Sequence, residues 1–175
     1  MEFIFYNWIK YSSLKTDTKL KWYVEKTPGN EIFLDKIKDD FPDSRMLFIV
    51  RDPRDNYFTY KKKWQDLSIT TFCQRWCKSY YSITRAKNVL IVRYEDLVQD
   101  QRDCLKEVCA FIDISYEDSL LVPSRAGGSW SGNSVFGENS QTGVHRNAMK
   151  QRWRALPATD IARIEKYCFD AMTEL

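Results

Sequence analysis

The sequence predicts an α/β fold in which a mainly parallel sheet is covered by helices. Three short apolar runs, at Lys21–Glu25, Met46–Val50 and Val89–Val92, have the length and composition of buried strands, and each ends in a polar turn. Helical patterns lie between them. Strands that alternate with helices are usually joined by crossovers, so we expect these runs to lie parallel in one sheet.

Four segments between and after the runs have apolar residues three and four positions apart, which is the spacing of one helix face. They are residues 30–41, residues 68–87, residues 101–112 and the stretch that follows Thr159, the predicted N-terminal cap of the last helix. In the first segment the stripe consists of Ile32, Phe33 and Ile37. In the second it consists of Phe72, Trp76, Tyr80 and Ile83.

Length and composition indicate one globular domain, spanning residues 1–175. The 175 residues are 43% hydrophobic and 15% aromatic, which is enough for a sizeable core. The net charge of +3 argues against a nucleic-acid-binding protein but allows a local basic pocket for a small anion. No apolar run approaches the ~20 residues of a membrane span, and we find no signal peptide, so the sequence predicts a cytoplasmic location.

The five cysteines are expected to be buried apolar residues rather than metal ligands or disulfides. Their number is odd, no Cys-x-x-Cys occurs, and Cys73 with Cys77 and Cys104 with Cys109 lie near helical spacing in apolar patterns. The chain has a single histidine, which argues against a histidine-rich zinc site. No metal site is predicted.

The turn after the second run has the features of an anion site. Arg51 lies at the tip of the predicted strand, Asp52 is a good helix cap, and Pro53 is favoured as the first helical residue. Asp55 lies three residues after the cap, in a capping-box arrangement. Thr59 lies about two turns into the helix and carries a hydroxyl that can bind an oxyanion. A guanidinium group beside a helix N-terminus suits a phosphate.

The same residues allow a purely structural interpretation. Arg51 could pair with Asp52, Asp55 or Glu95 and brace the turn. The spacing alone leaves both interpretations open.

The polar turn after the first run carries a candidate general base. Glu25 lies beside Lys26, whose charge could tune the carboxylate. The alternative is an ion pair that closes a strand-to-helix turn, with Pro28 and Gly29 as turn residues and Asn30 as the helix cap.

Three segments, "YVEKTPGNEIFLDKI", "MLFIVRDPRDNYFTYKKKW" and "VLIVRYEDLV", resemble the sulfotransferases that use 3′-phosphoadenylyl sulfate (PAPS). They are most similar to the bacterial enzymes related to heparan-sulfate and tyrosylprotein sulfotransferases. Order and spacing match from about residue 20 to the last helix. The resemblance implies a three-layer α/β fold of the P-loop NTPase type.

The resemblance also implies roles for individual residues. Arg51 and Thr59 correspond to the pair that holds the 3′-phosphate of the nucleotide. The glycine- and serine-rich loop 123–147 corresponds to the region that closes over the nucleotide, where His145 or Arg146 is the candidate for a further phosphate contact, and we select Arg146. Glu25 corresponds to the base that acts on the acceptor hydroxyl, and Lys26 to the lysine that supports it.

One element of the family pattern is not found in this sequence. The family binds the 5′-phosphosulfate with a loop of the Pro-Lys/Arg-Ser-Gly-Thr-Thr type, and residues 1–20 contain no glycine. The chain is therefore expected to begin after the first strand and its loop, as a fragment, a truncated product or a relative that lacks this half of the cofactor site.

The function that the resemblance implies is sulfuryl transfer from PAPS to a hydroxyl or amine group of an acceptor, without a metal. The alternative is a non-catalytic remnant that binds a nucleotide or a partner, which would account directly for the absent loop. A nucleotide kinase fits less well, because it needs a lysine-bearing phosphate loop and gives no reason for the pairing of Arg51 with Thr59.

Overall fold

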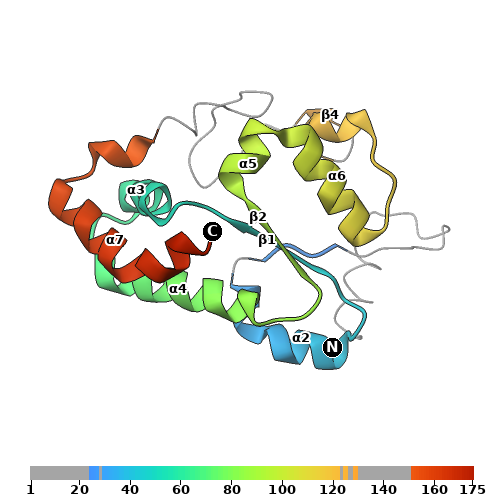
Figure 1. Cartoon of the computed structure of the whole chain (residues 1–175), viewed down its shortest axis with the longest axis horizontal. Helices are drawn as coiled ribbons and strands as arrows, with labels where there is room; N and C mark the ends of the chain where they lie inside the picture. Colours follow the sequence, from blue (N-terminus) through green and yellow to red (C-terminus); the bar gives the residue numbers. More distant parts are fainter. Residues whose placement is uncertain (1–23, 28, 123, 126–127, 130–150) are drawn as a thin grey trace. The chain divides into compact units, whose positions relative to one another are not determined.

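The computed structural model of the protein describes residues 24–27, 29–122, 124–125, 128–129 and 151–175. The chain forms two compact units, Met1–Ser44 and Arg45–Leu175. Figure 1 shows the helices and strands of each unit.

The first unit contains a short 3₁₀ helix, η1 (Asn30–Phe33), that continues into α2 (Leu34–Asp40). The predicted helix therefore exists, but its predicted apolar stripe is wrong. Ile32 and Phe33 are 55% and 56% exposed, and the buried residue is Leu34. A 3₁₀ segment has about 3.0 residues per turn instead of 3.6, so side chains that share a face in an α-helix do not line up across this start.

The first predicted strand is not formed in the part of it that the structure describes. Val24 and Glu25 have no regular secondary structure, and residues 21–23 lie outside the described residues. The other two predicted strands are both present. They form the parallel pair β1 (Met46–Val50) and β2 (Val89–Arg93), in the second unit.

Helices make up most of the described part of the second unit. Its helical elements are α3 (Pro53–Lys63), α4 (Ile69–Thr84), α5 (Tyr94–Gln99), α6 (Gln101–Ile112), η2 (Asp118–Leu121), η5 (Arg152–Ala155) and α7 (Ala158–Thr173). A two-residue antiparallel pair, β3 (Ser124–Arg125) and β4 (Gly128–Ser129), falls in the predicted loop 123–147, most of which lies outside the described residues. No helix in the described part of the chain is long and apolar enough to cross a membrane.

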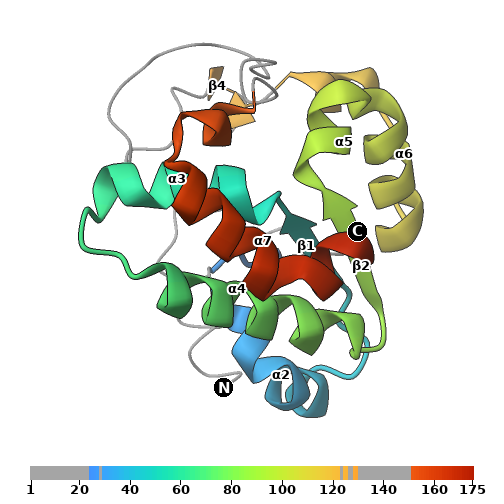
Figure 2. The ribbon, with the colours of Figure 1, turned by 60° about the vertical axis from the view of Figure 1, so that its left-hand side comes forward.

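The core lies where α4 and α7 pack together beside β1. Figures 1 and 2 both show these two helices side by side. The predicted stripe of α4 is buried, and its Trp76 and Tyr80 rings stack with their centroids 5.8 Å apart. From α7, Ile164 and Cys168 are 0% and 1% exposed. The 3.6-residue period of the sequence therefore identified the faces that pack.

All five cysteines are free thiols. Cys73, Cys109 and Cys168 are buried, as predicted, whereas Cys77 and Cys104 are only partly buried, which corrects the prediction for these two. The thiols of Cys73 and Cys168 meet between α4 and α7. This contact and burial raise the pKa of the Cys168 thiol, which keeps it protonated. These cysteines therefore act as small packing residues.

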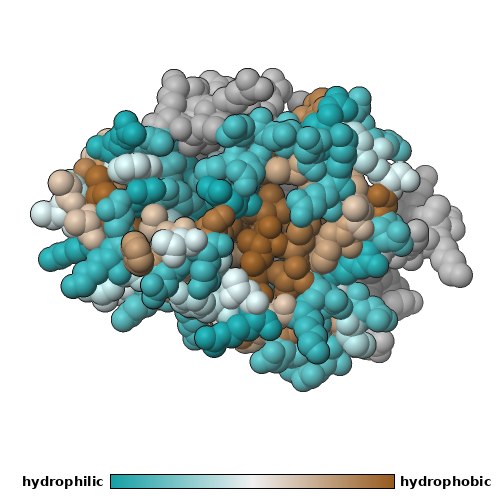
Figure 3. All heavy atoms as spheres, viewed as in Figure 1, coloured by the Kyte–Doolittle hydropathy of each residue, from teal (hydrophilic) through white to brown (hydrophobic). Residues whose placement is uncertain are grey.

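The two faces of β1 differ in burial. Phe48 packs against the core, whereas Leu47 and Ile49, which alternate with it, are 45% and 49% exposed. Alternation places neighbouring side chains on opposite faces of a sheet, so helices of this unit cover only one face at β1. Figure 3 shows apolar residues gathered in the middle of the face in view.

The start of α7 differs from the prediction. Pro157 occupies the capping position and no side chain caps the helix, so Thr159 is not the cap. Instead, Asp160 in the first turn accepts an ion pair from Lys61 of α3, with Nζ and Oδ2 2.8 Å apart. This interaction ties α3 to α7 and helps position α3, which carries the candidate site.

Candidate functional site

The ends of the two parallel strands meet at the start of α3. The register pairs Val50 with Arg93, so the residues that follow each strand become neighbours. The Arg51 guanidinium lies over the ring of Tyr94, 4.8 Å from its centroid. The geometry supports a cation–π contact that fixes the arginine at the strand tip.

The N-terminus of α3 is capped as predicted, but the capping box does not form. Asp52 Oδ1 accepts a hydrogen bond of 2.8 Å from the backbone N–H of Arg54, and Pro53 is the first helical residue. The backbone N–H of Asp52 donates to Glu95 Oε1 at 3.0 Å, in place of the expected bond to Asp55. The carboxylate of Glu95, just after the end of the neighbouring strand, therefore takes the place of the Asp55 carboxylate. Asp55 is then free to make other contacts.

Glu95→Ala is expected to lower the free energy of unfolding by about 1 kcal/mol, because a half-buried N–H loses its acceptor. Glu95→Gln keeps an acceptor oxygen and should therefore lower the free energy of unfolding by less than Glu95→Ala does. Urea unfolding measures both, with Asp96→Ala as the control, since Asp96 is exposed and its side chain forms a long ion pair with Arg93, at 3.8 Å. Equal costs for Ala and Gln at position 95 would rule out this role for the hydrogen bond.

Arg51 and Thr59 lie together, one at the strand tip and the other two turns into α3. The Arg51 side chain is only 17% exposed. Its Nη2 lies 3.4 Å from Asp55 Oδ2, and its Nη1 lies 3.5 Å from Thr59 Oγ1. Arg51 therefore braces the turn through Asp55, as the structural interpretation predicted, and it also faces the Thr59 hydroxyl.

Asp55 is a buried carboxylate, 5% exposed, that joins two distant segments. Its Oδ2 pairs with Arg51, while its Oδ1 accepts a 3.0 Å hydrogen bond from the backbone N–H of Trp153 in η5. A buried charge is stable only when it is paired and hydrogen-bonded, and both conditions are met here. Asp55 thus anchors η5 beside the start of α3.

The Thr59 hydroxyl already has a full set of partners. It donates to the backbone carbonyl of Asp55 at 3.0 Å and accepts from Arg51 at 3.5 Å. A hydroxyl has one proton, so Thr59 can donate to a bound anion only if that proton turns away from the carbonyl.

Arg152 of η5 also reaches this hydroxyl, with Nη2 3.5 Å from Thr59 Oγ1. The sequence patterns did not predict it as a site residue. The only signal was a pair of arginines on either side of Trp153, in a stretch without strong periodicity.

A third arginine, Arg54, is occupied by protein groups. It pairs with Asp52 at 2.6 Å and with Glu165 of α7 at 2.7 Å, and its guanidinium lies 4.2 Å from the centroid of the Trp153 ring. The hydrogen bond with Asp52, followed by that with Glu165, raises the pKa of Arg54. Arg54 therefore links α3, α7 and η5 and is a structural cation.

The predicted base lies in the first unit. Glu25 is exposed, its Oε1 accepts from the hydroxyl of Thr27, and its Oε2 accepts from the Asn30 side chain at 2.6 Å. Asn30 thus holds the glutamate instead of capping a helix through its side chain. These two bonds fix the direction of the carboxylate. Lys26 beside it is exposed.

The remaining predicted site residue, Arg146, lies outside the described residues, as do residues 1–20. In the part of the chain that the structure describes, no three His, Cys, Asp or Glu side chains gather as metal ligands. The described cluster of Arg51, Thr59 and Arg152 consists of donors and positive charge, which is the chemistry of an oxyanion site.

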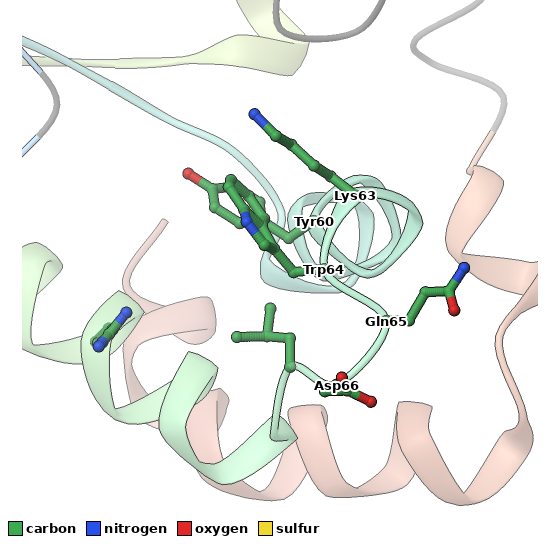
Figure 4. Close-up of a pocket in the computed structure, with 7 residues that line it drawn as sticks. Tyr60, Lys63, Trp64, Gln65 and Asp66 are labelled. Atoms are coloured by element: carbon green, nitrogen blue, oxygen red, sulfur yellow. The ribbon is translucent and has the colours of Figure 1, made fainter.

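A separate open cavity of about 610 Å³ lies at the C-terminal end of α3. Tyr60 and Trp64 stack at its edge with centroids 5.0 Å apart, and Lys63 lies over the Trp64 ring (Figure 4). Arg75 also lines it. None of the predicted site residues lines this cavity, which shows that the anion cluster and the cavity are distinct features of α3.

Comparison with known proteins identifies the family. A sequence model of the Sulfotransferase family matches residues 3–118. The chain is 18% identical to the sulfotransferase domain from the curacin biosynthetic pathway, with a TM-score of 0.62, over 85% of this chain and 62% of the other. The second solved structure is the sulfotransferase domain of the Synechococcus PCC 7002 olefin synthase, 22% identical with a TM-score of 0.57, over 82% and 57% of the two chains.

These structural similarities confirm the predicted fold class: an α/β fold with a parallel sheet flanked by helices, as in P-loop NTPase-like proteins. The chain spans about three fifths of the length of the two solved domains. No curated protein sequence matches it.

Proposed function

Because the chain belongs to the sulfotransferase family, we propose that it transfers a sulfuryl group from PAPS to a hydroxyl or amine group of an acceptor. The observation that carries this proposal is the pairing of Arg51 with Thr59 at the N-terminus of α3, with Nη1 and Oγ1 3.5 Å apart. The pair follows directly after a strand of the parallel sheet, and ligands of such folds bind beyond the C-terminal ends of the strands.

In this proposal the 3′-phosphate of PAPS binds at Arg51 and Thr59, and Arg146 adds a further contact. Three properties support the assignment: a guanidinium fork, a hydroxyl that can turn toward a ligand, and the positive end of the α3 dipole. The Tyr94 ring and Asp55 hold the guanidinium in place before the nucleotide arrives. Less side-chain entropy is then lost on binding.

Glu25 acts as the general base and Lys26 supports it. Glu25 takes the proton of the acceptor hydroxyl or amine as the acceptor atom forms a bond to sulfur. The bond between sulfur and the bridging phosphate oxygen breaks, and 3′-phosphoadenosine 5′-phosphate (PAP) leaves. The bonds from Thr27 and Asn30 aim the carboxylate, and the Lys26 ammonium offsets negative charge that develops during transfer.

The proposal treats residues 1–175 as one sulfotransferase-like domain that comprises both units. Glu25 belongs to the first unit and Arg51 to the second.

Calorimetry with PAP and with AMP tests the nucleotide site, because the two ligands differ only in the 3′-phosphate. Wild-type protein is expected to bind PAP more tightly than AMP. Arg51→Ala should weaken PAP binding by about 10-fold to 100-fold, the effect of losing charge-assisted hydrogen bonds, and leave AMP binding unchanged.

Arg93→Ala is the matched control, since Arg93 also ends a strand but has a 47% exposed side chain whose ion pair is with Asp96. It should bind both nucleotides like wild type. Equal affinity of the wild type for PAP and AMP would contradict the proposed site.

A further inference from the structure

The open cavity at the C-terminal end of α3 has an aromatic wall, formed by Tyr60 and Trp64. These residues are 39% and 45% exposed, and their rings stack at an interplanar angle of 30° with centroids 5.0 Å apart. Leu67 adds to the apolar part of the lining. The cavity, at about 610 Å³, has the size of a small-molecule cleft, and such clefts are usually lined by aromatic and apolar side chains around a few polar groups. Its size and lining suit a ligand with a flat ring.

The aromatic wall is fixed to the core of the unit. The Tyr60 ring packs against Phe72, which is 7% exposed, with ring centroids 6.0 Å apart. The backbone N–H of Leu67 donates to the carbonyl of Trp64 at 3.1 Å, and the Tyr57 hydroxyl donates to the carbonyl of Leu67 at 3.2 Å. A ligand that stacks on this wall therefore meets a surface that is already formed, so less side-chain entropy is lost on binding.

Two cations beside the aromatic wall lack a carboxylate partner. Lys63 and Arg75 both line the cavity, and both are exposed. The Lys63 ammonium lies over the Trp64 ring, 4.7 Å from its centroid. The nearby Lys61 pairs with Asp160 at 2.8 Å. Among the residues that the structure describes, by contrast, no carboxylate lies within ion-pair distance of the two lining cations. They are therefore available to an anion from solution.

The acidic residue among the described lining residues, Asp66, leaves the cavity with a net positive charge. Two cations and this one carboxylate line the cavity. In Figure 4 the Asp66 side chain extends away from the aromatic wall and from Lys63. A cleft with a surplus of positive charge concentrates anions and repels cations. An anionic group on a ligand would lie beside the two cations while its ring lies on the aromatic wall.

We propose that this cavity binds a small aromatic anion. The flat ring stacks on the aromatic wall, and an anionic oxygen group on the ring pairs with Lys63 and Arg75. Aromatic rings favour offset or edge-on contacts with Tyr and Trp, and ammonium and guanidinium groups form charge-assisted hydrogen bonds with anionic oxygens. This site goes beyond the proposed function, because none of the residues assigned to PAP or to the general base lines the cavity.

Calorimetry on the full chain tests the site with three probes. Naphthalenesulfonate has both the ring and the charge, naphthalenemethanol has the ring alone, and methanesulfonate has the charge alone. Wild-type protein is expected to bind naphthalenesulfonate about 10-fold more tightly than either of the other two, since only this probe uses the wall and the cations together. Added salt should weaken its binding, because the cations are exposed. Equal binding of naphthalenemethanol and naphthalenesulfonate would overturn the inference.

Variants show where the probe binds. Trp64→Ala removes part of the aromatic wall and should weaken naphthalenesulfonate binding by about 10-fold, and Lys63→Gln should weaken it by about 3-fold to 5-fold. Phe169→Ala and Lys62→Gln are the matched controls and should bind the probe like wild type. Phe169 is a 62% exposed aromatic residue of α7, and Lys62 lies over the Phe58 ring. All four substituted residues are exposed, so the thermal midpoint of the free protein should stay close to that of wild type.

Competition with PAP separates this site from the proposed nucleotide site. Saturating PAP is expected to leave the affinity for naphthalenesulfonate unchanged. If PAP displaces the probe, the probe binds at the nucleotide site, and this inference is overturned while the proposed function remains. If the two control variants lose as much affinity as Trp64→Ala and Lys63→Gln, the probe binds the surface at large, which also overturns it. Loss confined to the two cavity variants, without competition from PAP, supports the inference even if the wild type does not distinguish PAP from AMP.

Discussion

Asp55→Ala is expected to lower the free energy of unfolding by about 3 kcal/mol. Asp55 is 5% exposed and makes two contacts at once, to the Arg51 guanidinium and to the backbone N–H of Trp153. Its removal leaves a largely buried positive charge without its partner, which typically costs about 3–5 kcal/mol. It also leaves the N–H of Trp153 without an acceptor. We expect the lower end of this range of about 3–5 kcal/mol, because the Arg51 side chain is still 17% exposed to solvent.

Urea unfolding of two variants separates the two contacts. Asp55→Asn retains an oxygen that can accept from Trp153 but has no charge for Arg51, so it should lose only part of the stability. Asp103→Ala is the control, because Asp103 is exposed and pairs with Lys106 within one helix turn, and it should cost less than about 1 kcal/mol. If Asp55→Ala were as mild as Asp103→Ala, Asp55 could not be the anchor of η5.

Substitution of Asp55 is also expected to affect nucleotide binding. Asp55 fixes both Arg51 and the segment that carries Arg152, so Asp55→Asn should also weaken PAP binding although Asp55 does not touch the phosphate in our proposal. Stability and PAP affinity are thus expected to fall together for variants of this residue.

Glu25→Gln is expected to lower the rate of sulfuryl transfer to an aliphatic alcohol by about 10²-fold to 10⁴-fold, the usual contribution of a general base. Glutamine has nearly the same shape and can keep hydrogen bonds to Thr27 and Asn30, but it cannot accept the acceptor proton at neutral pH. PAP binding should remain at the wild-type level, because the proposed phosphate site lies in the other unit. Transfer from radiolabelled PAPS to alcohols measures the rate.

A second reaction serves as the control for the role of Glu25 as a general base. In the reverse direction, p-nitrophenyl sulfate donates its sulfuryl group to PAP, and p-nitrophenolate leaves without needing a proton. Glu25→Gln should therefore slow this reaction much less than transfer to an alcohol. Equal losses in both directions would point to a structural role for Glu25, and wild-type turnover with alcohols would remove it from the mechanism.

Local sequence patterns predicted several elements of the fold correctly. The apolar runs of β1 and β2 were placed within one residue of their observed ends, and the stripe from Phe72 to Ile83 is buried. The start of α3 at Asp52 and Pro53 was also correct. These features depend on interactions between residues that are close in sequence or on a regular apolar period, and the amino-acid order shows both directly.

Two of the predictions that failed concerned helix caps. Asp55 has the spacing of a capping box, but Glu95 supplies that hydrogen bond because the parallel register brings the two strand ends together. Thr159 has the chemistry of a cap, yet α7 begins at Ala158 without one. At both helix starts the sequence has a local capping pattern, but the folded structure does not form the corresponding hydrogen bond.

The sequence by itself determined that Arg51 and Thr59 flank the start of a helix, because residues at a strand tip and two turns into the next helix are placed by short-range geometry. Only the tertiary structure decided that Asp55 is buried, that Tyr94 covers Arg51, and that Arg152 joins the cluster. The physical reason is that strand register and the packing of η5 against α3 bring together side chains whose separation in sequence carries no periodic signal.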